Sequence, residues 1–162
     1  MSIFIFHPDI KGKASDKHHK NWMEVDHVSW GSQRQITSST STQGDRESSN
    51  TVISDLTLHR RIDKATAKLF LLACCGSGKE MKIHLTKTGA GDGSDIYMEY
   101  TLQNAIISHY EMATKASSRH RPIEEIKISF VGLKMKYITY DENNKPLAPI
   151  AVGFDTATNT KI

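Results

Sequence analysis

Apolar and polar residues alternate with a period of two in several separate segments of this chain. Because successive side chains of a strand point to opposite faces, each segment predicts a strand with one buried and one exposed face. Gly132 stands between two of these runs, which predicts a bulge or a sharp bend that redirects the chain. Residues 3–6 are apolar at every position and predict a short opening strand. The alternating segments are residues 81–86, 96–103, 126–130, 133–137 and 150–154.

One stretch, residues 64–75, has helical periodicity instead. Asp63 stands where an N-cap residue is expected, and Gly76 stands where a C-terminal glycine is expected. Many antiparallel strands and one helix predict a mainly β protein: a compact antiparallel barrel of two sheets with one flanking helix. The apolar residues that recur at helical spacing and share one helix face are Ala65, Leu69, Leu72 and Ala73.

The length of 162 residues suits a single domain spanning 1–162. With 38% hydrophobic and 24% charged residues, the composition is that of an ordinary soluble globular protein. No apolar run approaches the roughly 18 residues that a membrane helix needs, so we expect no stable membrane insertion. The first nine residues lack a basic lead-in and a cleavage site, so we expect no signal peptide.

Cys74 and Cys75 are the two cysteines of the chain. Adjacent cysteines cannot close a loop, and a mutual disulfide would be strained. We therefore expect both to be buried core residues of a protein that folds in a reducing compartment.

A long polar segment, about residues 32–50, does not fit a compact domain, and it is rich in hydroxyl side chains. A structureless run of this length is generally functional or disordered. Composition alone favours disorder, whereas the hydroxyl and β-branched residues would also suit an extended arm that orders on a partner edge.

No catalytic or metal-binding motif stands out. The eight histidines form no HExxH pattern, and the glycines of 76–79 lack the spacing of a phosphate loop. The acidic residues of 91–95 do not follow the spacing of an EF-hand. The net charge of +3 is too small to predict nucleic-acid binding. We expect binding or assembly, with no enzyme activity, cofactor, metal or nucleic-acid partner.

Residues 11–31 carry a distinctive pair of motifs. The sequence KGKASDKHH is followed by VSWG, and together they resemble the haemolysin-coregulated protein (Hcp) family of type VI secretion, with its KGES-x-D-x-x-H and WSWG patterns. Ala14 departs from the usual Glu, and Val28 departs from a common aromatic residue. Similarity continues through residues 55–76 and 153–159, so it spans about 7–160. The motif positions that match are Gly12, Ser15, Asp16, His19, Ser29, Trp30, Gly31, Asp63, Gly153 and Asp155.

The resemblance implies a two-sheet barrel with one helix, six copies of which close into a ring. Rings stack into a tube that works with a contractile sheath, a baseplate and a spike protein, and small effectors travel in its lumen. The subunit would assemble in the cytoplasm and then be secreted to the extracellular space or a target cell. Because the chain ends at Ile162, soon after the closing motif, we expect no toxin domain after the barrel.

Two roles follow for particular residues if the resemblance holds. Ser29, just before Trp30, matches the family's lumen-lining strand and becomes a candidate cargo contact. The alternative is that Ser29 is only a small strand residue. The polar segment becomes a candidate ring-stacking loop, with contacts from Thr37, Ser38, Ser39, Thr40, Gln43, Asp45 and Arg46.

A different class of function also remains open. The barrel pattern and an isoelectric point near 8.8 would suit a stand-alone β-barrel binding module for an oligonucleotide or ligand. Such a module would be monomeric, and its affinity for nucleic acid would fall steeply with salt. A tube subunit would instead form a salt-insensitive ring. A hydrolase without a recognisable motif is a third alternative.

Overall fold

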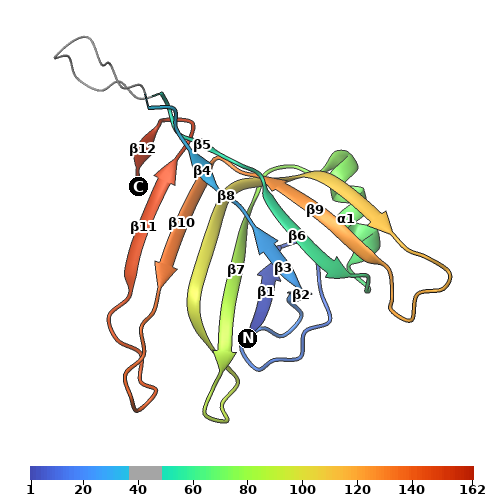
Figure 1. The fold of residues 1–162 in the computed structure, drawn as a ribbon, viewed down its shortest axis with the longest axis horizontal. Helices are drawn as coiled ribbons and strands as arrows, with labels where there is room; N and C mark the ends of the chain where they lie inside the picture. The colour runs from blue at the N-terminus through green and yellow to red at the C-terminus, as the bar shows by residue number, and fades with distance from the viewer. Residues whose placement is uncertain (37–48) are drawn as a thin grey trace.

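Antiparallel strands and one short helix make up the computed structural model, which describes residues 1–36 and 49–162 (Figure 1). This confirms the predicted mainly β fold of antiparallel sheets with one helix. The elements in chain order are β1 (Ser2–Phe6), β2 (Met23–Val25), β3 (His27–Ser29), β4 (Ser32–Gln33), β5 (Val52–Ile53), β6 (Leu56–Arg61), α1 (Thr66–Cys75), β7 (Lys79–Thr88), β8 (Ser94–Ala113), β9 (Ile123–Ser129), β10 (Gly132–Tyr137), β11 (Ile150–Asp155) and β12 (Thr160–Lys161).

Two sheets share the long strand β8. The N-terminal half of β8 lies in a first sheet with the order β12-β11-β10-β8-β7-β1-β2. Its C-terminal half pairs with β9, which pairs with β6 and then β3, and these form the second sheet. Asn104 has a φ of 50° in the middle of β8, where the strand passes from one sheet to the other. All of these pairs are antiparallel. β8 belongs to both sheets and connects them (Figure 1).

The chain also changes sheets between β9 and β10. β9 ends at Ser129 in the second sheet, and β10 begins at Gly132 in the first sheet. This is the bend that Gly132 predicts. A Cβ atom at this position would lie 2.3 Å from the Gln103 side-chain oxygen, so glycine allows the close pairing with β8.

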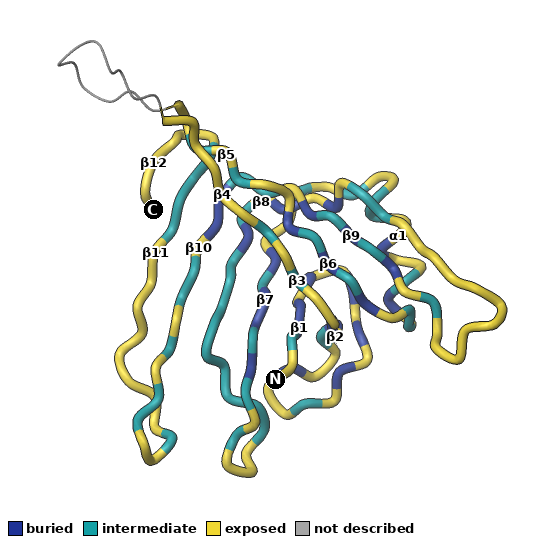
Figure 2. The backbone as a smooth tube through the Cα atoms, in the orientation of Figure 1, coloured by how far each residue is buried: buried dark blue, intermediate teal, exposed yellow. Residues whose placement is uncertain are grey.

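The core lies between the two sheets. The alternation of residues 81–86 and 126–130 predicts the buried face of each strand correctly, because Met81, Ile83, Ile126 and Ile128 are all buried. Figure 2 shows buried residues concentrated in β1, β6 and β7. On β9, Glu125 and Lys127 alternate with the buried residues and follow the predicted register. On β7, the prediction that His84 and Thr86 are exposed is wrong: both are buried, because His84 contacts His19 of the preceding loop and the register shifts between Leu85 and Thr86.

The predicted inward face of β11 is the main error. Ile150 is 67% exposed and Val152 is 61% exposed, although their alternation matches that of the core strands. The second sheet consists of β3, β6, β9 and half of β8, and none of these strands covers β11 (Figure 1). Among the described residues, the two sheets therefore do not close over β11.

The helix begins slightly later than predicted and lies against β8. Asp63 is not the N-cap residue: Ala65 is, and Asp63 Oδ1 accepts a hydrogen bond from the Ala65 backbone N–H at 2.8 Å. Gly76 does end the helix, but with extended backbone (φ −70°) instead of a left-handed conformation. A Cβ atom at Gly76 would lie 2.5 Å from the Leu72 carbonyl oxygen, so the position needs glycine for space.

The prediction that both cysteines are core residues is wrong. Cys74 and Cys75 are exposed, because the buried side of α1 is formed by Leu69 and partly by Leu72. None of the described residues forms a helix long and apolar enough to cross a membrane.

Candidate functional site

The most unusual surface of the molecule is an apolar patch on β10, β11 and the loop between them. Tyr137 lies opposite Ile150, and Met135 lies opposite Val152, so their side chains share the face of the first sheet that elsewhere forms the core. Leu147 in the connecting loop is also half exposed. We call these five residues the β11 patch. Contiguous apolar surface of this kind marks an interaction site in a soluble protein.

A groove of about 260 Å³ borders the β11 patch where the core ends. Trp30 lies at this border and contacts Tyr100 edge-to-face at 5.8 Å. Thr51 and Ile53 line the other wall. The groove is mostly apolar, so it extends the patch toward β4 and β5.

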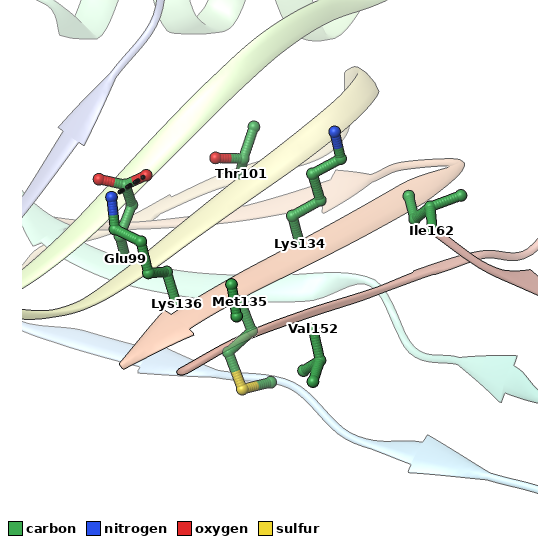
Figure 3. A pocket seen from close by; sticks show the side chains of 8 residues that line it. Glu99, Thr101, Lys134, Met135, Lys136, Val152 and Ile162 are labelled. Carbon is green, nitrogen blue, oxygen red and sulfur yellow. Dashed lines mark ion pairs between the residues drawn. The ribbon is translucent and has the colours of Figure 1, made fainter. Parts of the chain in front are cut away.

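The opposite face of β10 is charged. Figure 3 shows Lys134 and Lys136 on one side of β10 and Met135 on the other. A shallow pocket of about 300 Å³ lies on the charged side, where Glu99 Oε1 is 3.6 Å from Lys136 Nζ. β10 is therefore amphipathic, and its apolar face is the one left without a covering layer.

Ser29 lies on the exposed face of the second sheet. It is paired with Thr57 on β6, which is paired in turn with Lys127 on β9. These residues line a hollow of about 470 Å³ together with Trp30, Ser54 and Asp55. The position leaves Ser29 accessible, and its role as a cargo contact stays a prediction.

The N-terminal motif forms a tight loop between β1 and β2. Gly12 N–H donates to the Asn21 carbonyl at 2.8 Å, and a Cβ atom at Gly12 would overlap the Trp22 carbonyl oxygen. Ala14, where the family pattern has Glu, is buried, whereas Ser15 is exposed. The glycine of the motif is thus required by a close approach of two backbone segments.

Asp16 and His19 of the same loop lead into a buried chain of polar groups. Asp16 Oδ2 lies 2.7 Å from His19 Nδ1, and His19 Nε2 lies 2.9 Å from His84 Nδ1 on β7. His84 Nε2 is 3.2 Å from Glu99 Oε2. Phe4 stacks on the His19 ring at 4.4 Å. This series of polar contacts holds the loop against the outer face of the first sheet.

Burial and hydrogen bonding set the protonation states of Asp16 and His84 in this series of contacts. Burial lowers the pKa of His84 to about 4, and the neighbouring His19 adds to this effect. Burial opposes ionisation of Asp16, but hydrogen bonds from His19, Ser94 and the His18 backbone outweigh it and lower its pKa to about 2. Near neutral pH, His84 is therefore uncharged, so only one of its two ring nitrogens, which face His19 and Glu99, carries a hydrogen.

A second buried polar group joins the start of α1 to both sheets. Arg60 forms ion pairs with Asp63, at 2.6 Å, and with Glu124. Tyr110 donates to Glu124 Oε2 at 2.7 Å, and burial together with this carboxylate raises the pKa of Tyr110 to about 12. The matched family residue Asp63 is thus part of a structural ion-pair network.

The remaining matched residues form local contacts near the sheet ends. Gly31 N–H donates to Ser54 Oγ at 2.9 Å, and Asp155 Oδ1 accepts from the backbone of Ala157 at 2.8 Å. Gly153 lies under the Ile162 side chain. The predicted stacking contacts Thr37, Ser38, Ser39, Thr40, Gln43, Asp45 and Arg46 lie outside the described residues.

The sequence motifs are not brought together into one site. Ser29, the Asp16–His19 chain and Asp63 occupy three separate places, and the β11 patch contains none of them. Sequence reasoning missed this patch because alternation alone cannot say whether the covering layer comes from the same chain. One feature of the sequence could have indicated the patch: it predicts many strands that each need a covering layer, but only one short helix.

Comparison with known proteins gives a consistent result. The sequence model of the family described as "Type VI secretion system effector, Hcp" matches residues 4–137. A solved structure described as a type six secretion system protein is 23% identical with a TM-score of 0.90, and the match covers 99% of both chains. No curated protein sequence matches the chain.

Two further solved structures share the fold. Hcp1 from Salmonella typhimurium is 22% identical with a TM-score of 0.76, and the match covers 99% of this chain and 98% of that one. A type VI secretion system effector from Yersinia pestis is 23% identical with a TM-score of 0.70, and the match covers 94% of this chain and 98% of that one. Each match covers at least 94% of both chains, so the similarity extends over the whole fold.

Proposed function

Because this chain belongs to the Hcp family of the type VI secretion system, we propose that it is a structural subunit of the inner tube, and not an enzyme. Six copies close into a ring, rings stack inside the sheath above the baseplate, and the tube leaves the cytoplasm with the spike. Small effectors are carried in the lumen. The single domain supplies both the ring contacts and the lumen wall.

The exposed β11 patch is the observation that carries this proposal. Covering a Val or Ile side chain contributes about 1.5–3 kcal/mol relative to leaving it in water. Ile150 and Val152 remain mostly exposed in the isolated chain, so a neighbouring subunit that covered them would recover this energy.

A closed ring needs two different surfaces on each subunit, because its contacts are head-to-tail. Phe70 and Leu71 on α1 form a second exposed apolar surface, with Phe70 56% exposed. α1 and β11 lie at opposite sides of the molecule (Figure 1). This arrangement suits a ring in which the β11 patch of one subunit meets a different surface of the next.

The test is the substitution Val152→Glu. A buried carboxylate without a partner would oppose docking, so the ring should dissociate to monomers in size exclusion with light scattering at tens of micromolar. Val152→Leu is the matched control, because it keeps an apolar side chain at the same position and should leave the ring intact. A monomeric wild-type chain, or a Val152→Glu chain that still forms hexamers, would contradict the assignment.

We also propose that the polar segment makes the ring-to-ring contact. Its two ends are held together, because Ser49 N–H donates to the Gln35 carbonyl and Gln35 N–H donates to Ser49 Oγ, both at 2.8 Å. Replacing residues 37–48 by a short Gly/Ser link should leave hexamers intact and abolish tubes and secretion. Loss of the hexamer would place the segment inside the ring contact, and unchanged secretion would remove its proposed role.

Ser29 is the proposed cargo contact. It borders the hollow of about 470 Å³ on the second sheet, which offers hydroxyl, carboxylate and ammonium groups to a bound protein. Ser29→Trp should leave the ring intact and reduce retention of at least one co-secreted effector. Effector amounts that are unchanged throughout would show that Ser29 is only a small strand residue.

A further inference from the structure

Histidine and glutamate side chains form a row across the exposed face of the second sheet. His27 on β3 lies opposite His59 on β6, and His59 lies opposite Glu125 on β9. Glu125 lies in turn opposite Glu111 on β8. Four adjacent strands thus each present a metal-binding type of side chain at the same level, so that donor atoms on neighbouring strands lie close together.

The tightest part of this row is a group of three residues. One ring nitrogen of His109 and one carboxylate oxygen from each of Glu111 and Glu125 all lie within 4.8 Å of one another. His109 Nε2 is 3.5 Å from Glu111 Oε2. Within residues 1–36 and 49–162, no other set of three or more His, Cys, Asp or Glu side chains is gathered this closely.

A bulge in β8 brings His109 into this group. The register between β8 and β9 shifts between Ile107 and His109, and the exposed hydroxyl of Ser108 bonds to Asp55 at 2.7 Å. Without the shift, strict alternation from the buried Ile107 would direct residue 109 toward the core. Bulges redirect side chains in this way beside functional sites. The irregularity therefore puts His109 and Glu111 on the same exposed face as Glu125.

The two carboxylates are not fully neutralised by the protein. Like charges directly opposite each other on paired strands are destabilising. Lys127 Nζ is 4.0 Å from Glu125 Oε1, and His59 Nε2 is 3.3 Å from Glu125 Oε2, so Glu125 has two partial partners. Glu111 lies close to His109. A bound cation would remove the repulsion between the two glutamates.

We propose that His109, Glu111 and Glu125 bind a divalent transition-metal ion of the zinc type. One imidazole and two carboxylates are ligands that Zn²⁺ accepts, and three protein ligands leave a fourth position for water or a partner's side chain. Ligand atoms on one tetrahedral Zn²⁺ are about 3.4 Å apart. His109 Nε2 and Glu111 Oε2 are already 3.5 Å apart, so only the distances to Glu125 need to close, by about 1.4 Å at most. All three extend from the exposed face, where rotamer changes can supply that movement.

His59 positions Glu125 instead of binding the metal. Its Nε2 contacts the same carboxylate, and groups that hold a ligand in place contribute to metal affinity without touching the ion. The metal would link β8 to β9, and through Glu125 and His59 also to β6. This site is a property of the single chain and does not depend on the proposed ring.

Isothermal titration of the full chain with Zn²⁺ is the test. We expect one equivalent to bind per chain, with affinity at least tenfold weaker in His109→Ala and in Glu111→Gln, and a smaller loss in His59→Ala. His120→Ala and Glu142→Gln are matched controls, because both residues are exposed and lie in loops outside the group of three, His120 between β8 and β9 and Glu142 between β10 and β11. These controls should bind Zn²⁺ like the wild type. Mg²⁺ should bind far more weakly, because it prefers oxygen ligands.

Thermal unfolding with and without Zn²⁺ is a second, independent measurement of binding. Zn²⁺ should raise the thermal midpoint of the wild type by mass action, and EDTA should reverse this rise. The double variant His109→Ala/Glu111→Gln should have the wild-type circular dichroism spectrum and lose the rise. Absence of Zn²⁺ binding, or equal binding by wild type and double variant, would overturn the site. A folded monomer that still binds Zn²⁺ would contradict the proposed ring but leave the metal site standing.

Discussion

The first sheet has two halves with the same sequence pattern but different surroundings. In β7 and the N-terminal half of β8, the apolar face is covered by the second sheet, and Ile83 is 0% exposed. In β10 and β11, the same face continues without a cover, and Ile150 is 67% exposed. Figure 2 shows this contrast as buried residues along β7 and exposed residues along much of β11.

This difference separates two meanings of an alternating pattern. Alternation says that one face of a strand needs an apolar partner, but the partner can come from the same chain or from another one. In β7 the partner strands are β6 and β9, which belong to the same chain and share its core. In β11 we attribute it to a neighbouring subunit. The predictions below test this contrast by making similar changes in both halves.

The largest effect is expected from removing a buried charge of the second sheet, which covers the closed half. Glu124→Ala leaves Arg60 buried with one carboxylate fewer, which should cost about 3–5 kcal/mol of unfolding free energy. Lys136→Ala breaks the more exposed pair with Glu99 and should cost about 0–1 kcal/mol. Urea denaturation of the two variants provides the measurement. Equal losses would mean that burial does not set the contribution of these two ion pairs.

A matched apolar pair gives the next largest difference. Ile83→Ala should destabilise the isolated subunit by about 2–5 kcal/mol, because it opens a cavity in the core. Ile150→Ala should change the stability of the isolated subunit by less than about 0.5 kcal/mol. It should instead weaken the ring, measured as a higher concentration for half-dissociation. A large loss of subunit stability in Ile150→Ala would show that β11 belongs to the core.

Much of the fold follows from local sequence rules. The strands around Met81 and Ile126, the bend at Gly132 and the helix with Leu69 inside can all be predicted, because each depends on periodicity or on a single glycine. The exposure of Cys74 and Cys75 could not be predicted in this way. It depends on how α1 is rotated against β8, with Leu69 buried, and this packing between distant segments cannot be read from the helix sequence alone.

The candidate sites were harder to predict, for a similar reason. Ser29 and the Asp16–His19 pair could be found, because they lie in a recognisable local motif. The group of His109, Glu111 and Glu125 joins two strands whose register includes a bulge, and a bulge cannot be placed from alternation alone. The β11 patch depends on which strands the second sheet lacks, and no single segment carries that information.

An acid-dependent loss of stability should distinguish the N-terminal loop from both halves. His84 has its folded-state pKa lowered to about 4, so below its ordinary value of 6.5 the unfolded chain binds a proton that the folded chain does not. Stability should therefore fall as pH drops from about 6.5 to about 4. Burial also lowers the pKa of His7, which acts in the same direction.

The matched variants for this effect are His84→Gln and His120→Gln. His84→Gln should flatten the dependence of unfolding free energy on pH between 6.5 and 4, measured by urea denaturation at several pH values. His120→Gln, in an exposed loop, should leave the dependence unchanged. If His84→Gln has the same pH dependence as the wild type, then another group is responsible for acid lability.

The smallest effect concerns which surface of a neighbour covers the β11 patch. Cys74 and Cys75 are exposed on α1, next to Phe70 and Leu71, so a maleimide should label both thiols readily in the isolated subunit. If α1 meets the β11 patch of the next subunit, labelling should be severalfold slower in the assembled ring, and the dissociated Val152→Glu chain should regain the fast rate. Mass spectrometry of the labelled peptides, with Cys75→Ser to separate the two thiols, measures the rates. Equal rates in ring and monomer would show that α1 stays open to solvent, and the covering surface would then have to lie on another part of the subunit.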